Sequence, residues 1–527
     1  MDYLWPVLVD PASSRLEIID SAGRFQSPLN GFTRTASRPG ERMRLSLSFE
    51  NLNAERRAAM QSFVAVLRGA VHRVLAYDHS HRIRGSFPGT ELLSNNTFAN
   101  GTTGWATNTS MALSVADRAA RSTRVANLGS TFGLLATTAA ASTTQYAPHV
   151  LRVALIPGRG AFSNLGLRFG STSFGIDYGS VASLSPGLLT FAVTLPAATA
   201  FVGLIETAVT GLIAGEYADI PYVSLSRCAL VDNGPNAMTR SDEIDHADWT
   251  KTRATASANT NTAPDGTITA DSLIEDTTAS STHIFAPATM PARTSVAEDL
   301  CVFGDFHRGS GTRDVQLRVG SDGSNFSHCT FDLGAGTAGS VANVGTATNG
   351  RAFIRSLGNG WYRCYVIALA AASTTIFFSY TMVSAGSNTY TGDGTSSIYA
   401  WRCGGCRSSV PVAGAQTTTT ALPTGTAQTG NGIYVKGLPA STNGLLLPGD
   451  QYQLGNQIHI VTAPVNSDAA GLAFLEGNPA RRSAAADNAP VIINQPMGTF
   501  FLESDVNGWS NKPGIFSDAE IVLVEAA

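Results

Sequence analysis

Two cysteines separated by two glycines, Cys403 and Cys406, form the one pair in this sequence at the spacing used by metal sites and dithiol redox sites. A structural zinc site needs four ligands, and the sequence offers neither a second such pair nor two histidines at ligand spacing. A thioredoxin-like site needs a βαβ context, which the sequence lacks. We therefore expect no metal and no cofactor, and we expect most of the six cysteines to be small buried apolar residues. The sequence leaves the redox state of this pair open.

Residues suited to hydrolytic catalysis are sparse. His246 has no partner histidine one helical turn away, which excludes the paired-histidine motif of metallopeptidases. Glu243 and Asp245 are close in sequence, but this proximity does not establish the separation that two carboxylates need around a glycosidic bond. The sequence contains no GxSxG, no P-loop and no dinucleotide-binding fingerprint. We expect no enzymatic activity.

Aromatic side chains offer a different chemistry, because a pyranose ring stacks its C–H face on an aromatic ring while polar groups at the rim bind its hydroxyls. The competing interpretation is that a tryptophan in a β protein fills the core. Trp361 and Tyr362 are neighbours, so on a strand at most one of them lines a given surface. Arg363 and Asp393 are equally well explained as solvated surface charges. The candidates for glycan binding are Trp105, Trp249, Trp361, Tyr362, Arg363, Asp393 and Trp401.

Length and composition bound the class of protein. A chain of 527 residues suggests roughly three to four domains. Only 14% of residues are charged, while Ser, Thr, Gly and Ala abound, a profile typical of β-rich virion or extracellular modules. The net charge of −4 argues against nucleic-acid binding. No apolar run approaches the roughly twenty residues of a membrane helix, and the first residues lack the features of a secretory signal.

The chain begins with patterns that predict a strand followed by a helix. Apolar residues alternate from Met43 to Phe49, as in a half-buried strand. Asn53 is placed to cap a helix, Met60 belongs to its apolar face, and Arg68-Gly69 predicts its end. A further strand is expected up to residue 77.

The strand and turn signals predict a mainly β protein, and the resemblance described below implies that its two ends form one split unit. We expect a β-barrel or sandwich with one helix, formed by residues 1–90 and 408–527. Residues 91–231 and 232–407 are expected to form two inserted jelly-roll-like β-sandwiches, because short strands such as 149–156 and 188–195 are separated by Gly, Pro and Ser turns.

The two ends resemble the ring domain of tailed-phage distal tail proteins of the siphophage type. At the front the resemblance is carried by FQSPLNG, RPGER, the helix ending in LRG, and Arg84-Gly85; at the back it is carried by LLLPGDQYQLGN and by the segment around Asn507-Gly508-Trp509. It covers about 90 residues at the front and about 115 at the back. Its motif residues are Trp5, Phe25, Pro28, Gly31, Arg42, Arg68, Gly69, Gly449, Asp450, Gly455, Asn456 and Trp509.

The middle segments are similar to carbohydrate-binding jelly rolls and to the concanavalin-like modules of phage tail and fibre proteins. The first opens with a leucine pair and reaches Gly104-Trp105; the second runs from Asp248-Trp249 through 359–363 to Tyr399-Ala400-Trp401. The second departs from its family at the end, where Arg402-Cys403 replaces the usual acidic closing strand. This departure puts a shared ligand site in doubt.

The resemblance implies a structural virion protein that forms a ring, expected to be a hexamer, between the tail tube and the tail tip. Its partners would be further copies, the tail tube protein, and hub or tip proteins; it would be assembled in the host cytoplasm and reside in the virion. The inserted modules would bind host surface polysaccharide or only decorate the ring. The alternative is a receptor-binding adhesin or a polysaccharide depolymerase of a tail fibre.

Overall fold

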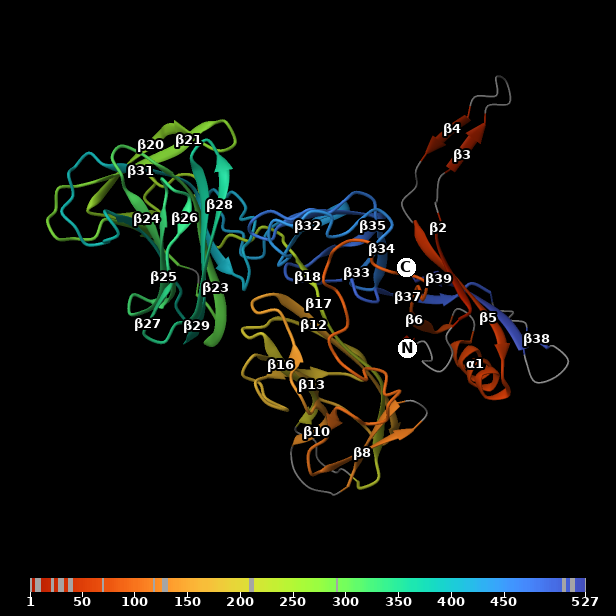
Figure 1. Ribbon diagram of the computed structural model, residues 1–527. Helices are drawn as coiled ribbons and strands as arrows, with labels where there is room; N and C mark the ends of the chain where they lie inside the picture. Colours follow the sequence, from red (N-terminus) through yellow and green to blue (C-terminus); the bar gives the residue numbers. More distant parts are fainter. Residues whose placement is uncertain are drawn as a thin grey trace.

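A computed structural model presents the chain as four β-rich bodies (Figure 1). The structure describes residues 2–4, 11–19, 23–26, 33–36, 41–68, 71–116, 119–125, 131–207, 213–290, 292–504, 509–511 and 517–526. Strands dominate, and the described residues contain one α-helix. The fold-class prediction is confirmed: the protein is mainly β, with a split unit at the two ends of the chain and two inserted β-sandwiches.

The two ends of the chain pair with each other in one sheet, which we call the end sheet. Its strand order is β1-β6-β37-β39-β5-β2, and a short strand, β38, pairs with β39. The alternating segment predicted from sequence is β5, which buries Met43, Leu45, Leu47 and Phe49. The strands are β1 (Asp2–Leu4), β2 (Ser13–Ile19), β5 (Arg42–Leu52), β6 (Arg73–Tyr77), β37 (Met497–Leu502), β38 (Trp509–Asn511) and β39 (Ser517–Glu525).

Helix α1 (Ala54–Leu67) packs on this sheet. The Asn53 side chain accepts a hydrogen bond of 2.9 Å from the Arg56 backbone N–H, so the predicted N-cap is confirmed. Met60 and Leu67 are buried against the sheet. The helix ends at Arg68, whose φ of 51° is left-handed. No helix among the described residues is long and apolar enough to span a membrane.

A two-stranded arm extends from the end sheet. Strands β3 (Gly23–Gln26) and β4 (Thr33–Ala36) pair only with each other, and Figure 1 shows them projecting away from the rest of the molecule. The arm grows out of the β2–β5 ladder, in which Ile19 lies opposite Arg42. A hairpin of two strands alone is marginally stable in water.

A closed barrel lies between the end sheet and the second sandwich (Figure 1). Its cyclic order is β18-β32-β35-β34-β33-β36. The strand β18 falls in the segment expected to close the first sandwich, and it is instead a barrel strand, so the chain returns to the barrel between its two insertions. The strands are β18 (Ala229–Val231), β32 (Gln428–Lys436), β33 (Gln451–Leu454), β34 (Gln457–Val461), β35 (Ala473–Ala485) and β36 (Pro490–Ile492).

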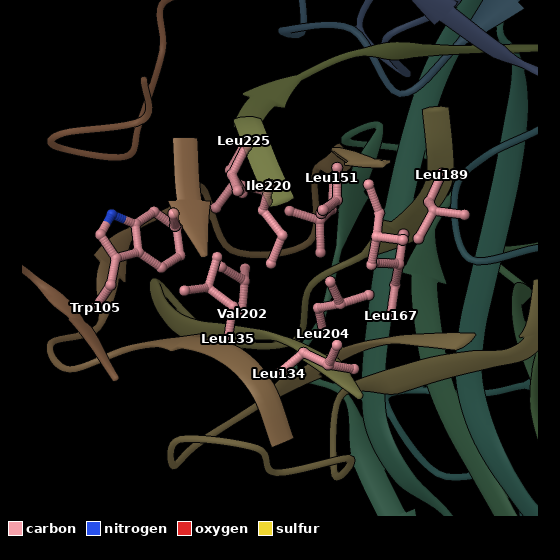
Figure 2. Close-up of a cluster of buried hydrophobic side chains, with 14 of the residues drawn as sticks. Trp105, Leu134, Leu135, Leu151, Leu167, Leu189, Val202, Leu204, Ile220 and Leu225 are labelled. Atoms are coloured by element: carbon pink, nitrogen blue, oxygen red, sulfur yellow. The ribbon is translucent and has the colours of Figure 1, made fainter. Parts of the chain in front are cut away.

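The first inserted body is a sandwich of a six-stranded and a five-stranded sheet. Its core is mostly aliphatic with several buried phenylalanines, and Figure 2 shows Trp105 at one end of the cluster beside Leu135 and Val202. The first sheet has β7 (Trp105–Ala106), β10 (Thr131–Thr137), β11 (Ala141–Ser142), β13 (Leu165–Gly170), β14 (Gly179–Leu184) and β16 (Thr199–Thr207). The second has β8 (Met111–Ala116), β9 (Ala119–Arg124), β12 (Pro148–Arg159), β15 (Gly187–Thr194) and β17 (Tyr217–Arg227).

The second inserted body is a larger sandwich of a seven-stranded and a six-stranded sheet. Its core contains several stacked or tilted aromatic rings. The first sheet has β19 (Trp249–Thr252), β22 (Ile284–Pro287), β24 (Asp314–Asp322), β25 (Asn325–Asp332), β26 (Thr337–Ala338), β27 (Ala342–Val344) and β30 (Phe377–Val383). The second has β20 (Ala254–Thr262), β21 (Ile268–Glu275), β23 (Val296–Arg308), β28 (Thr348–Gly358), β29 (Trp361–Ser373) and β31 (Ser397–Arg407).

Candidate functional site

The four tryptophans considered for sugar stacking are core residues. Trp105, Trp249, Trp361 and Trp401 are 6%, 2%, 3% and 2% exposed. The first three donate their indole N–H to backbone carbonyl groups, at 3.1 Å to Asn95, 2.9 Å to Arg240 and 3.0 Å to Thr262. A buried ring presents no face to a sugar, so we withdraw these four as stacking platforms.

The remaining candidates of the second sandwich also have structural roles. The Arg363 guanidinium forms a buried ion pair with Asp305 and donates to the Ala413 carbonyl, on the sheet face that turns toward the barrel. Tyr362 is half-buried and packs on the sandwich core. Neither side chain is available as part of an open sugar site.

Asp393 is exposed but engaged in its own loop. Its carboxylate accepts hydrogen bonds from the backbone N–H groups of Thr395 and Ser396, at 2.7 and 2.6 Å, and from both of their hydroxyls. These hydrogen bonds hold the pKa of Asp393 well below its usual range, and the bond from the Ser396 hydroxyl has the largest effect. This carboxylate therefore organises a turn of the sandwich.

Cys403 and Cys406 lie on different sides of their strand. Cys403 belongs to the core of the second sandwich, whereas Cys406 packs in a separate cluster with Cys301, toward the barrel. All six cysteines are buried and free, and burial raises the pKa of the Cys403 thiol well above its ordinary value. Among the described residues, no group of three or more His, Cys, Asp or Glu side chains is arranged to hold a metal ion.

Two motif segments, one from each end of the sequence, meet at one buried carboxylate. Asp450 is fully buried and accepts three backbone hydrogen bonds: from Arg84 at 2.7 Å, from Gly85 at 3.0 Å and from Leu447 at 2.8 Å. Gly85 lies so close to the opposite chain that a Cβ there would be 2.1 Å from the Leu445 carbonyl oxygen. Arg84-Gly85 and the segment 445–450 are thus held together at the Asp450 carboxylate, and we call this contact the Asp450 joint.

The other motif residues occupy turns and strand ends. Gly449 and Gly455 have left-handed φ values of 96° and 60°. The Asn456 carbonyl accepts a hydrogen bond from Thr499, which links the barrel to the end sheet, and Arg42 begins β5. Phe25 and Trp509 belong to β3 and β38, of which only the backbone is described. Trp5, Pro28, Gly31 and Gly69 lie outside the described residues.

An exposed aromatic pair lies on the outside of the barrel. Among the side chains that the structure describes, Tyr434 and Phe474 are the two large aromatic ones left about half exposed, at 54% and 50%. They are cross-strand neighbours on β32 and β35, with ring centroids 5.1 Å apart and an angle of 58° between their planes. The end of the Phe474 ring lies over Gly432, where a Cβ would be 2.1 Å from it. Any larger residue at position 432 would displace this ring.

Polar side chains flank the aromatic pair. Along β35, Phe474, Glu476 and Asn478 face outward, while the residues between them are buried. The Asn478 side chain accepts a hydrogen bond of 3.2 Å from Asn431. On the other side of the pair, the Gln428 side chain accepts a hydrogen bond of 2.9 Å from the Tyr434 backbone N–H.

A hollow of about 530 Å³ adjoins this strip. Gln428 connects the two, because its side-chain N–H also donates to Asn233, which lines the hollow, at 3.1 Å. Arg407 from the second sandwich is at the rim and pairs with Glu298 at 3.2 Å. The lining residues are Asn233, Arg407, Pro423, Thr424, Gly425, Ala427, Ala484, Ala485, Ala486, Asp487 and Asn488.

We call the aromatic pair, its flanking polar side chains and the hollow the barrel strip. The sequence interpretation did not find it. The signal was present, since Ile433, Val435 and Leu475 are buried on either side of the outward Tyr434 and Phe474. Their pairing across the β32–β35 ladder required a register between segments about forty residues apart, which sequence spacing alone does not supply.

Comparison with known proteins adds little to this geometry. No family model and no curated protein matches the chain. Among solved structures, the tandem CBM22-1–CBM22-2 domain of Paenibacillus barcinonensis Xyn10C is similar at 11% identity and a TM-score of 0.20, over 61% of this chain and 99% of that one. A Paenibacillus xanthan lyase is similar at 11% identity and a TM-score of 0.18, over 70% of this chain and 35% of that one. Similarities at these TM-scores carry no argument about fold or function.

Proposed function

We propose that this chain is a structural virion protein that forms a ring at the distal end of a phage tail, joining the tail tube to the tail tip. The observation that carries the proposal is the Asp450 joint. It unites Arg84-Gly85 with Leu447, two motif segments of the distal-tail resemblance that are separated by more than 350 residues. A joint that draws on the motifs of both ends is what a single interrupted ring domain requires.

The β3–β4 arm gives this ring a means of closure. A two-stranded hairpin that pairs only with itself gains stability when it docks on another surface. In a ring, the arm of each subunit lies on the next one, a heterologous contact that closes after a fixed number of copies, here expected to be six. The neighbours along the tail axis are then the tail tube protein and the hub or tip proteins.

In this proposal the two sandwiches are bodies carried by the ring, with no catalytic role. Their connection to the rest of the molecule is firm: Arg152 of the first sandwich is buried and donates to the Asn494 and Gln495 carbonyls, at 2.8 and 3.0 Å. The second sandwich is held by an ion pair of 2.8 Å between Arg355 and Asp468. The protein would be assembled in the host cytoplasm and reside in the virion.

The test is the mass of the purified chain in solution, measured by light scattering together with negative-stain images. Six copies in a ring are expected, with purified tail tube protein added as a template if the chain alone is monomeric. A stable trimer, or a monomer that remains so with the template, would overturn the proposal and favour a fibre or adhesin.

A hairpin deletion makes the test specific. Because Ile19 lies opposite Arg42, a two-residue Asn-Gly turn can join them and remove the arm without disturbing the ladder. The shortened chain is expected to keep its unfolding midpoint and to lose the ring. A matched control, Ile268→Ala on the exposed surface of the second sandwich, is expected to leave the ring intact.

A further inference from the structure

We propose that the barrel strip binds a neutral polysaccharide chain. This goes beyond the ring role, because the strip lies on the outside of the barrel and needs no second subunit to complete it. It also places recognition outside the two inserted sandwiches, where the sequence interpretation had placed it.

The two rings supply the apolar half of a sugar site. A pyranose presents a flat C–H face that stacks on an aromatic ring, and such rings must be accessible to accept it. Tyr434 and Phe474 have this accessibility, and their planes are inclined at 58°. One ring therefore stacks under a sugar while the other contacts its edge.

The flanking side chains supply the polar half. Glu476 and Asn478 follow Phe474 at two-residue steps on the same face, each step advancing about 6.6 Å along the strand. When one sugar unit stacks on the aromatic rings, the next units of the chain lie over the Glu476 carboxylate and then over the Asn478 amide. A carboxylate accepts hydrogen bonds from hydroxyl groups, and an amide both accepts hydrogen bonds from them and donates to them.

The hollow, which is linked to the rings through Gln428, gives the chain a second place to bind. Its volume of about 530 Å³ is within the range of small-ligand sites. Its lining residues include Asn233, Asn488 and Pro423, a mixture of polar and apolar types suited to a sugar. A run of several sugar units would span the hollow and the rings.

The charges around the strip favour a neutral glycan over an acidic one. Glu476 is exposed beside the rings, whereas Asp487, which lines the hollow, is paired with the buried Lys436 at 2.9 Å. The basic side chain at the rim, Arg407, is already paired with Glu298. Uronic acids or phosphorylated sugars would meet the Glu476 carboxylate here, while the cations nearby are already paired.

The polar surroundings also favour a glycan over a protein partner. The centre of a protein–protein interface is a wide apolar patch depleted of charge. Here the outward neighbours of the two rings on the same strands are Gly432 and Glu476, so the apolar area is about the size of the rings themselves. An area of this size matches one or two sugar rings.

The experiment titrates the full-length chain by calorimetry with cellohexaose, maltohexaose and chitohexaose, with hyaluronan as the acidic comparison. At least one neutral hexaose is expected to bind. Tyr434→Ala and Phe474→Ala are each expected to weaken this binding about tenfold, and Glu476→Gln less. Ile268→Ala, which removes an exposed apolar side chain of the second sandwich, is the matched control and is expected to bind unchanged.

Three outcomes would overturn the proposal: none of the neutral hexaoses binds the native chain, binding survives the Tyr434→Ala/Phe474→Ala double variant, or hyaluronan binds as well as the neutral sugars. If the double variant instead changes the oligomeric mass of a chain that binds no sugar, the strip is a protein interface. Circular dichroism of each variant checks that it folds. The result is independent of ring formation, since a monomeric chain carries the complete strip.

Discussion

The inserted sandwiches and the barrel differ in one respect: only the barrel leaves an aromatic pair accessible among the described side chains. The sandwiches enclose their tryptophans among aliphatic and aromatic side chains, whereas the barrel leaves Tyr434 and Phe474 half exposed on its outer wall. The sandwiches are wide enough to close over large rings. The small barrel encloses Tyr452 and Phe87 together with residues such as Ile433 and Leu475, and leaves Tyr434 and Phe474 on its outside. Resemblance to a sugar-binding fold is therefore no guide to where an accessible ring lies.

The largest effect expected from this comparison is on the stability of the second sandwich. Trp249→Ala removes a ring that contacts Phe285 and Tyr380, and should lower the free energy of unfolding by about 3–5 kcal/mol. Trp249→Phe keeps an aromatic ring and should cost less. Denaturant unfolding followed by tryptophan fluorescence measures both. A Trp249→Ala protein as stable as the native one would mean that this ring is not a core residue.

A somewhat smaller loss of stability is expected from replacing Arg363, which the sequence suggested as a hydrogen-bonding residue of a sugar site. Arg363→Ala leaves Asp305 buried without its partner, which should lower the free energy of unfolding by about 3 kcal/mol. Replacing both residues, Asp305→Asn with Arg363→Met, should restore part of this stability. Chemical denaturation of the single and double variants tests the pair. Equal losses in the two variants would contradict a coupled role.

The pH response is expected to be a property that the barrel and the first sandwich share. Burial lowers the pKa of His459 in the barrel to about 4, and that of His149 in the first sandwich likewise to about 4. Below pH 6.5 the unfolded chain binds a proton at each site while the folded chain does not, so stability falls between about pH 6.5 and pH 4 and is level above pH 6.5.

His459→Gln removes one of these two protonation sites and retains an N–H donor for the Pro479 carbonyl, which His459 contacts at 2.7 Å. Thermal unfolding from pH 7 to pH 4 should therefore show a loss smaller by about 2–3 kcal/mol than in the native chain. If the native chain and the His459→Gln variant lose the same stability between pH 7 and pH 4, His459 is protonated in the folded state.

The smallest stability effect is expected at the exposed pair. Tyr434→Ala and Phe474→Ala should each change the free energy of unfolding by less than about 1 kcal/mol, because these rings gain little burial and contribute mainly one cross-strand contact. Thermal melts of the two variants beside Trp249→Ala make the comparison direct. A loss at Phe474 as large as that at Trp249 would mean that the outer ring is part of the barrel core.

The local elements were predictable because their signals lie within a few residues. The alternation from Met43 to Phe49 gives β5, and the Asn53 cap places the start of α1. The barrel strand β18 was not predictable. Its three residues are all buried and show no alternation, and they pair with residues of β32 and β36 that lie more than two hundred residues away in the sequence. The burial of the tryptophans likewise depends on how sheets stack, and the sequence shows only that the residues are large.

Strand β39, the last strand of the end sheet in the sequence, determines when this sheet can be completed during synthesis. β5 pairs with β39, whose first residue lies 465 positions after the last residue of β5. At the usual rate of about 5–20 residues per second, the ribosome needs roughly 25–95 s to supply it. Both sandwiches are complete by then, while the inner edge of β5 waits with its backbone hydrogen bonds unmade. The nascent chain must keep this edge from joining another polypeptide, and the end sheet is the last body of the molecule to be completed.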